Sequence, residues 1–390
     1  MLTRDDGDFI QRALELAERG EGHTRPNPPV GAVIVRTGKI VGEGWHKRCG
    51  GDHAEVAAIK DAASPLQGST LYVTLEPCSK PGCVGACTDA IIAAGIKKVV
   101  YLVPDPNPKN RGKAKRVLSR HGIECVKVCR QTCEEKAWDY CLGLKPLVEW
   151  GSRMIAPFAK HVTTRLPFVT VKLAMSLDGK ICDDYGNAKW ISSARSRRSV
   201  GWERARVDAI MVGAETVRKD NPSLLSHNKR NDDLVRVVVT RSGKLPKNAR
   251  IFTDGAPNET LVFKIGEAYP PGEASCEAGA MRGASRRFNK DGSLSAKSGG
   301  TPLPRCKDLR DVLRQLGKAG VMHVLCEGGL KLARSLADAG LVDRWISITA
   351  PIVIGSRHLK DATRLCHYEG GMSDPDAGDC EERYERCSLA

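Results

Sequence analysis

Apolar positions follow two different spacings along the first part of the chain. In residues 7–19 they recur every three or four positions, as on the buried face of an amphipathic helix, whereas residues 70–75 (TLYVTL) form a short continuous apolar run, as in a buried strand. These patterns predict helices over 7–19, 53–63, 87–94, 112–121 and about 131–143, and strands over 30–36, 40–45, 70–75, 98–103 and 123–128. Alternating helices and strands are typical of a layered α/β domain.

A second alternating series follows a strongly apolar strand that begins at Pro167. It predicts strands over 167–174, 208–212, 235–240, 260–264, 321–326 and 343–350, and helices over 194–205, 307–318 and 329–339. We therefore predict two α/β domains, 1–145 and 167–390, joined by a linker at 146–166. Residues 266–304 are rich in Gly, Ser, Pro and Arg, with little periodicity, and we expect a flexible insertion there; the polar tail from Gly371 is expected to be weakly ordered.

The composition indicates the charge of the expected partners and the redox state of the compartment. The formal net charge of +15 favours anionic partners such as phosphorylated metabolites and NADPH. The basic run 109–116 has no interleaved aromatic residues for stacking bases, so we expect a solvated face and no nucleic-acid partner. The 15 cysteines are odd in number and scattered, which predicts free thiols in a reducing cytoplasm. No apolar stretch is long enough for a membrane span, and the N-terminus lacks a signal-peptide pattern.

One histidine, two cysteines and a glutamate in the first domain are the parts of a zinc deaminase site. His53 and Glu55 lie at a predicted helix start, and Pro77 ends the 70–75 strand so that Cys78 follows directly. A nitrogen and two thiolates leave one position of a tetrahedral zinc site open for water, and Glu55 would move protons. We assign the second thiolate to Cys87, which opens the next helix; Cys83 is the competing candidate.

Motifs in the second domain are weaker. Glu327-Gly328-Gly329 precedes a predicted helix, so its backbone amides could bind a phosphate, although in isolation an ordinary tight turn is the better reading. No Gly-x-Gly-x-x-Gly fingerprint follows an early strand of this domain, which argues against a Rossmann fold.

Taken together, the motifs resemble a known family. In the first domain these are 27–31 (NPPVG), 42–46 (GEGWH), His53-x-Glu55, the wide spacing from Cys78 to Cys87, and 105–108 (DPNP); in the second they are 172–180 (KLAMSLDGK), 190–193 (WISS), 212–217 (VGAETV), 220–222 (DNP) and 327–329 (EGG). The set resembles the bifunctional riboflavin biosynthesis proteins, diaminohydroxyphosphoribosylaminopyrimidine deaminase and 5-amino-6-(5-phosphoribosylamino)uracil reductase in one chain.

The resemblance implies a fold and two activities. It implies a cytidine-deaminase-like three-layer domain followed by a dihydrofolate-reductase-like domain, with Zn²⁺ and NADPH as cofactors. The deaminase removes the 2-amino group of 2,5-diamino-6-ribosylamino-4(3H)-pyrimidinone 5′-phosphate, and the reductase converts the ribosyl group to ribityl. A homo-oligomer and a small phosphorylated pyrimidine are the implied partners.

It also implies site residues, position by position. His53, Cys78 and Cys87 match the zinc ligands and Glu55 the proton shuttle. The deaminase substrate would be lined by Asn27, His46, Lys80, Asp105 and Asn107. NADPH would be contacted by Ala174, Trp190, Ser192, Thr216, Asp220, Gly328 and Gly329, and the reductase substrate by Arg204, Leu224, His227 and Glu327. The chain departs from the family pattern at Lys80, Cys83, Ala188, Trp202 and His227.

Three alternatives remain at this stage. The second domain could be a scaffold or a degenerate reductase beside an active deaminase. The protein could instead be a nucleic-acid base deaminase with a basic binding domain, revealed by RNA binding that weakens steeply with salt. It could also be a non-catalytic zinc protein, against which Glu55 argues, because a purely structural site has four protein ligands and no need of a base.

Overall fold

The computed structural model describes residues 1–80, 85–134, 138, 143–182, 191–226, 233–256, 259–266, 305–352 and 354, together with the short strands 287–288, 294–295 and 380–385. Contacts divide the chain into two compact units, Met1–Arg165 and Leu166–Ala390. Among the described residues, no helix has the length and apolar character needed to cross a membrane.

The first unit is built on a five-stranded sheet. Its strands, in sheet order β2-β1-β3-β4-β5, are β2 (Lys39–Trp45), β1 (Gly31–Arg36), β3 (Thr70–Leu75), β4 (Lys98–Val103) and β5 (Glu124–Lys127). Strand β1 is antiparallel to β2 and β3, whereas β3, β4 and β5 are parallel. Ala32 and Ile34 enter one hydrophobic core and Val33 and Val35 the other. Both faces of the sheet are therefore buried, as the apolar runs predict.

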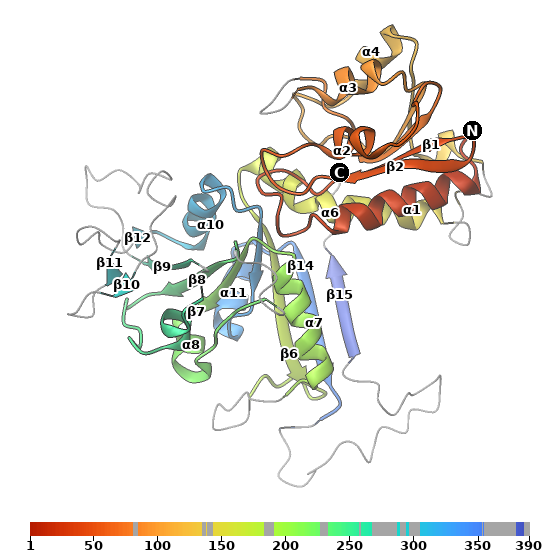
Figure 1. Ribbon diagram of the computed structural model, residues 1–390. Helices are drawn as coiled ribbons and strands as arrows, with labels where there is room; N and C mark the ends of the chain where they lie inside the picture. The colour runs from red at the N-terminus through yellow and green to blue at the C-terminus, as the bar shows by residue number, and fades with distance from the viewer. Residues whose placement is uncertain are drawn as a thin grey trace, which may run out of the picture. The chain divides into compact units, whose positions relative to one another are not determined.

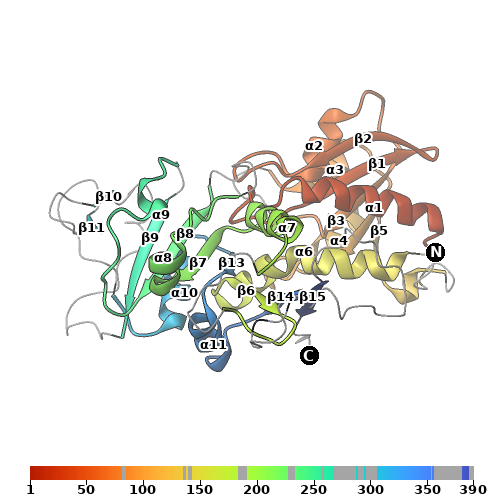
Figure 2. The same cartoon turned by 90° about the horizontal axis from the view of Figure 1, so that it is seen from below.

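Helices cover both faces and make three layers. Helices α1 (Arg4–Glu18) and α6 (Leu144–Thr164) lie alongside each other on one face (Figures 1 and 2). On the other face lie α2 (Ala54–Asp61), α3 (Cys87–Ala93) and α4 (Lys113–Arg120). The predicted three-layer α/β architecture is confirmed. The helix expected over 131–143 lies largely outside the described residues, and its start belongs to a short 3-10 turn, η1 (Arg130–Thr132).

Two glycine-containing strands allow the helices to approach the sheet closely. A Cβ at Gly31 would lie 2.0 Å from the carbonyl oxygen of Ala13 in α1, and a Cβ at Gly44 would lie 2.3 Å from the backbone nitrogen of Ala58 in α2. Such distances exclude any side chain, so the helix backbone rests directly on the strand. Gly44 in this way determines how closely helix α2, which begins just after His53, packs against strand β2.

Helix α6 occupies the segment expected to link the domains, 146–166. Its residues Leu144, Leu147, Met154 and Ile155 are buried in the same core as α1. A Cβ at Gly151 would lie 2.6 Å from a methyl group of Leu102 in β4. The segment is thus packed onto the first unit, and the boundary between the units falls between Arg165 and Leu166.

The second unit contains an eight-stranded sheet in the order β12-β9-β8-β7-β13-β6-β14-β15. The bounds are β6 (Phe168–Ser176), β7 (Ala209–Gly213), β8 (Val235–Thr240), β9 (Thr260–Ile265), β12 (Arg305–Cys306), β13 (His323–Cys326), β14 (Arg344–Ala350) and β15 (Cys380–Glu385). Every neighbouring pair is parallel except β14 with β15.

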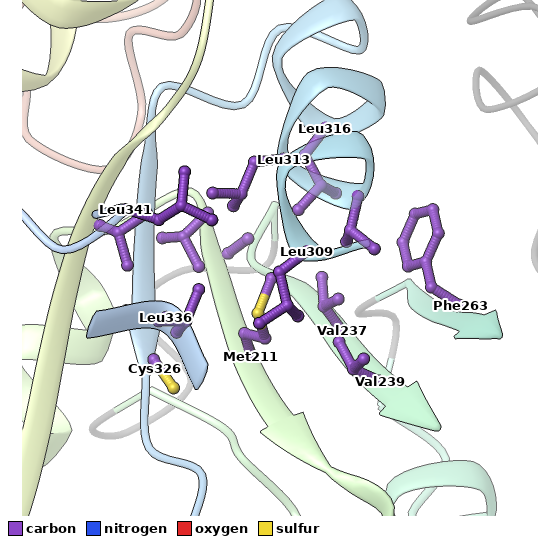
Figure 3. Packing of buried hydrophobic residues seen from close by; sticks show 14 of the residues in the cluster. Met211, Val237, Val239, Phe263, Leu309, Leu313, Leu316, Cys326, Leu336 and Leu341 are labelled. Atoms are coloured by element: carbon purple, nitrogen blue, oxygen red, sulfur yellow. The ribbon is translucent and has the colours of Figure 1, made fainter. Parts of the chain in front are cut away.

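Helices α10 (Leu309–Lys318) and α11 (Leu330–Asp338) cover one face of this sheet. Figure 3 shows the packing, in which Leu309, Leu313 and Leu316 of α10 lie over Met211, Val237 and Val239 of the central strands. Helices α8 (Ala214–Asp220) and α9 (Arg250–Thr253) contribute to a separate core built on the other strand positions, while α7 (Ala194–Ala205) packs on β14 through Val200. The central strands are buried on both faces, consistent with their continuous apolar sequences.

Three features of the second unit differ from or extend the predictions. Residues Cys380–Glu385 form β15, paired with β14 at six positions, although the tail was expected to be weakly ordered; strand pairing needs only backbone groups, so a polar sequence does not prevent it. Helices α8 and α9 are too short to give a periodic signal. Most of 266–304 lies outside the described residues, apart from Gly266 and the small antiparallel pair β10 (Arg287–Phe288) and β11 (Leu294–Ser295).

Candidate active sites

Three chain turns on one face of the first sheet bring the predicted metal ligands together. His53 directly precedes α2 with an extended backbone (φ −72°, ψ 161°), and Glu55 lies in the first turn of that helix. Cys78 follows β3 after Pro77, and Cys87 is the first residue of α3. The amide of Cys87 donates to the sulfur of Cys78 at 3.3 Å, which ties the two turns to each other.

The three ligand atoms lie close enough together to bind a single metal ion. The Nδ1 of His53 lies 3.1 Å from the sulfur of Cys87 and 3.6 Å from that of Cys78, and the two sulfurs are 3.3 Å apart. All three ligand atoms lie within 4.8 Å of one another. One nitrogen and two sulfurs are a donor set that suits zinc and leaves a coordination position for water. Cys83, the competing candidate, lies outside the described residues.

A hydrogen bond between the thiol groups of Cys78 and Cys87, 3.3 Å apart, shifts their pKa values in opposite directions. This bond is the main cause that lowers the pKa of Cys78 to about 4, together with hydrogen bonds to His53 and the Cys87 amide. The same bond, followed by burial, raises the pKa of Cys87. Zinc binds cysteines as thiolates, so metal binding at this cluster releases protons and depends on pH.

Glu55 is buried beside this cluster, with 3% of its surface exposed. Burial, followed by repulsion from the Cys78 thiolate, raises the pKa of its carboxyl. A carboxyl group with a raised pKa holds a proton more readily than an exposed one, which favours a role as a general acid–base residue.

His46 and Asn27 form a hydrogen-bonded pair next to the cluster. Burial lowers the pKa of His46, which favours the neutral ring. With Nδ1 donating to the carbonyl of Asp52 (2.9 Å), Nε2 accepts from the amide of Asn27 at 3.1 Å. The ring of His46 meets that of His53 edge to face at 5.4 Å. The amide nitrogen of Asn27 is thereby fixed, and its oxygen is turned away from His46.

The loop after β4 carries Asp105 and Asn107. Because β3 and β4 are parallel neighbours, with Leu75 opposite Val103, this loop leaves the sheet at the same edge as Cys78. Asp105 accepts from the amide of Asn107 at 2.8 Å, and burial raises the pKa of its carboxyl. Lys80, also predicted at the substrate, is exposed.

In the second unit, four of the predicted residues lie just after the carboxyl ends of two neighbouring strands: Glu327, Gly328 and Gly329 follow β13, and Thr216 follows β7. Glu327 follows β13 directly and accepts two hydrogen bonds from the guanidinium of Arg204, at 2.6 and 2.8 Å. Arg204 also donates to the carbonyl oxygen of Leu225 at 3.1 Å. The carboxyl edge of a parallel sheet is where ligands bind in open α/β folds.

The starts of α8 and α11 meet at this edge through Thr216 and Gly329. The amide of Gly329 donates to the hydroxyl oxygen of Thr216 at 3.3 Å, so this N–H is already engaged within the protein. A Cβ at Gly329 would approach only the Thr216 oxygen, at 3.9 Å, whereas one at Gly328 would lie 2.7 Å from a methyl group of Leu332. A side chain at Gly328 would therefore press on Leu332, whereas Gly329 leaves open space above the helix.

The remaining predicted residues are placed less centrally. Ala174 lies near the end of β6 and packs against the small core of α7 and β14, and Asp220 ends α8. Ser192 accepts a hydrogen bond from Arg197 through its carbonyl oxygen. Leu224 is buried in a core cluster with an unusual φ of +55°. Trp190, His227 and Ala188 lie outside the described residues.

Two residues that shape the deaminase site were not singled out from the sequence. Gly44 lets the first turn of α2 rest on β2, and Glu76 binds the loop after β4 through both carboxylate oxygens. Gly44 lies inside the 42–46 motif used for the family resemblance, and Glu76 lies just before Pro77 and Cys78. Nothing in their residue types marks those roles, because each depends on a partner distant in sequence.

Comparisons with known proteins identify the family of each unit. Residues 3–103 match the family model described as the cytidine and deoxycytidylate deaminase zinc-binding region, and residues 167–366 match the RibD C-terminal domain. The riboflavin biosynthesis protein RibD of Escherichia coli is 36% identical over 369 residues, covering 94% of this chain and 92% of the relative. That of Aquifex aeolicus is 34% identical over 358 residues, covering 91% and 89%.

Solved structures give the same result. RibD of Acinetobacter baumannii superposes with a TM-score of 0.70 at 32% identity, covering 90% of this chain and 88% of that chain. A structure from Thermotoga maritima has a TM-score of 0.71 at 34% identity with the same coverage. It is described as a diaminohydroxyphosphoribosylaminopyrimidine deaminase/5-amino-6-(5-phosphoribosylamino)uracil reductase.

Proposed function

Because this chain belongs to the RibD family of riboflavin biosynthesis, whose members combine a zinc-dependent deaminase with an NADPH-dependent reductase, we propose that it catalyses two successive steps on one pyrimidine. Its substrate is 2,5-diamino-6-ribosylamino-4(3H)-pyrimidinone 5′-phosphate. The first unit hydrolyses the 2-amino group to release ammonia, and the second reduces the ribosyl side chain to ribityl.

In the deaminase, His53, Cys78 and Cys87 would hold zinc. Zinc bound there would supply the Lewis acidity that activates water for attack on the ring carbon. Glu55 accepts one proton from that water and passes it to the ring nitrogen; it then moves the remaining hydroxyl proton to the exocyclic amine, which leaves as ammonia while the ring carbonyl forms. Burial of Glu55 supports this role because it keeps the carboxyl ready to hold the proton.

The substrate is oriented by side chains around this cluster. Asn27, whose amide nitrogen is held by His46, presents its oxygen to a donor group of the pyrimidine. Asp105 and Asn107 on the loop after β4, together with Lys80, complete the contacts to the ring and the ribose phosphate.

In the reductase, NADPH supplies the hydride, and the protein supplies binding and orientation. Thr216, Gly328 and Gly329 lie at the pyrophosphate, while Ala174, Trp190, Ser192 and Asp220 contact the rest of the cofactor. Arg204, Leu224, His227 and Glu327 contact the substrate. Arg204 acts while paired to Glu327, so that the carboxylate fixes the direction of its guanidinium.

One observation carries the proposal: three donor atoms of the zinc-ligand types converge beside a buried carboxylate. We also propose that the protein works in the cytoplasm as a homo-oligomer, without a nucleic-acid partner. The free cysteine thiols among the described residues support the cytoplasmic location.

The experiment that tests the function is a paired assay on the zinc-loaded protein with the diaminopyrimidine ribosyl phosphate. Ammonia release and NADPH oxidation are followed in parallel, with and without NADPH. We expect both signals from the unaltered protein, and from Glu55→Ala a protein that keeps zinc but releases no ammonia. Ammonia without NADPH oxidation would restrict the activity to the first unit. Ammonia release by Glu55→Ala at the original rate would disprove its role as proton carrier.

A further inference from the structure

Glu76 is a buried carboxylate that has no part in the steps described above. It lies between the end of β3 and Pro77, and 3% of its surface is exposed. A buried carboxylate is costly unless it is hydrogen-bonded. Its hydrogen bonds therefore show what it holds in place.

Both oxygens of Glu76 accept hydrogen bonds from backbone amides of one loop. Oε2 accepts from the amide of Asp105 at 3.2 Å, and Oε1 accepts from the amide of Ala114 at 3.3 Å. Asp105 opens the loop that follows β4, and Ala114 lies in the first turn of α4, where Gly112 offers no side-chain cap. One carboxylate therefore closes both ends of the segment 105–114 and also caps α4.

The loop between these two points is held by its own hydrogen bonds. Asp105 accepts from the amide of Asn107 at 2.8 Å, and the side chain of Asn107 accepts from the amide of Lys109 at 3.0 Å. The carbonyl oxygen of Asn107 accepts from the amides of Asn110 and Arg111. These bonds hold the internal conformation of the loop, so its position relative to the sheet depends on how its ends are anchored.

Glu76 also fixes its own position relative to the metal-ligand turn. Its amide donates to the carbonyl oxygen of Val103 at 2.9 Å, which extends the pairing of β3 with β4 by one residue. Cys78 follows two residues later. Glu76 thus joins the turn that carries a metal-ligating sulfur to the loop that carries Asp105 and Asn107.

We propose that Glu76 is a positioning residue for the deaminase substrate: its carboxylate holds the 105–114 loop at a set distance from the Cys78 turn, so that Asp105 and Asn107 meet the pyrimidine ribosyl phosphate. This inference rests on the proposed function of the first unit. A charged acceptor matters because two N–H groups converge on it, and an amide side chain offers an oxygen to only one of them.

The test is Glu76→Gln in the full-length, zinc-loaded protein, with Glu124→Gln as the matched control. Glu124 is an exposed carboxylate of the same sheet, 3.8 Å from Lys98. For Glu76→Gln we expect the KM of deamination to rise about tenfold, since a hydrogen bond to a charged group is lost. The kcat, the zinc content and NADPH oxidation on a substrate already deaminated should change by less than about threefold. Hydrogen exchange at the amides of Asp105 and Ala114 should accelerate in this variant alone.

Glu76→Asp provides a second variant, because its shorter side chain keeps the charge but reaches only one amide. The same rise in KM is expected. An unchanged KM in a variant that keeps its zinc would overturn the proposal. Loss of zinc from both variants would also overturn it, by assigning Glu76 to support of the Cys78 turn. Absence of ammonia release from the unaltered protein would instead refute the proposed function itself.

Discussion

Arg204 and Glu327, 123 residues apart in the sequence, form a two-pronged ion pair in which both oxygens of the carboxylate accept from the guanidinium at 2.6 and 2.8 Å. The pair is largely buried, with 22% and 10% of the side chains exposed. Burial opposes ionisation of Glu327, but attraction and hydrogen bonding from Arg204 outweigh it and hold the pKa of the carboxyl below its usual value. The pair connects α7 to the end of β13.

This relationship predicts how stability depends on pH. Since the pKa of Glu327 is lower in the folded state, the pair stabilises the second unit above about pH 4.5, and this contribution is lost as the pH falls through the folded pKa. Glu327→Gln leaves Arg204 buried without its partner, and should cost about 3 kcal/mol at neutral pH. The stability of the variant should also depend less on pH in the acid range, because residue 327 no longer titrates.

Calorimetry of the full chain measures this effect, because the transition of the second unit can be recognised by its shift on adding NADPH. Glu215→Gln is the control, since Glu215 pairs with Arg218 at 3.0 Å but is mostly exposed; a change below about 0.5 kcal/mol is expected there. Equal effects of the two variants would contradict the special role of the buried pair.

Removal of zinc should separate the two activities. The ligand atoms His53 Nδ1, Cys78 Sγ and Cys87 Sγ all belong to the first unit, so chelation should abolish ammonia release and leave NADPH oxidation within about twofold on a substrate already deaminated. Cys87→Ser should lower zinc content and ammonia release together, whereas Cys49→Ser, at an exposed thiol, should change neither. Metal analysis measures the zinc content, and the ammonia and NADPH assays measure the two activities. Loss of NADPH oxidation in parallel with ammonia release would contradict the prediction that the activities are separate.

Gly44 provides a test of how α2 is positioned. A Cβ at this residue would lie 2.3 Å from the nitrogen of Ala58 and 2.6 Å from the carbonyl oxygen of Ala54, both backbone atoms of α2. Gly44→Ala should therefore displace the helix that follows His53 and carries Glu55, with a loss of about 2 kcal/mol of stability and at least a tenfold loss of ammonia release.

The matched control is Gly7→Ala, where the new methyl would meet Leu144 at an ordinary 3.6 Å inside helix α1. That change should stabilise the protein by about 0.5 kcal/mol or leave it unaltered. Thermal unfolding and the ammonia assay distinguish the two glycines. A Gly44→Ala protein with normal activity would mean that α2 can shift without disturbing the site.

Local patterns predicted most of the elements and the metal cluster. Alternation of apolar spacing located all strands of the first sheet and all of the second except β12 and β15, and the residue types at 53, 55, 78 and 87 already indicated zinc chemistry. Each of these signals comes from a short stretch of sequence, namely an apolar run or a motif such as His53-x-Glu55. The fold is needed only to bring the stretches with the metal ligands together. The predicted cofactors and the α/β class agree with the structure and with the family match.

What could not be predicted depends on contacts between distant residues. The partners of Glu76 are backbone amides of residues 105 and 114, which any amino acid except proline supplies, so no pattern announces them. The glycines of β2 can be read as weak strand positions until α2 is seen to lie against them. The engagement of the Gly329 amide by Thr216 likewise required the adjacency of β7 and β13.

Gly329 offers a test of the cofactor position. Its backbone (φ −60°, ψ 168°) suits any residue, and an added methyl would approach only the oxygen of Thr216 at 3.9 Å. Gly329→Ala should therefore fold normally. If the pyrophosphate of NADPH approaches this helix start, the methyl group takes up its space and the KM for NADPH should rise at least tenfold, with ammonia release unchanged. An unaltered KM would place the pyrophosphate elsewhere.

The packing of α6 determines where the two activities could be separated. A fragment ending at residue 145 would remove most of this helix and uncover apolar side chains of α1, including Leu14, which share a core with Leu147 and Met154. Such a fragment is expected to aggregate. A cut between Arg165 and Leu166 leaves that core intact. A gene that encodes the deaminase alone must therefore include the whole of α6, and a gene for the reductase alone can begin at the strand that follows it.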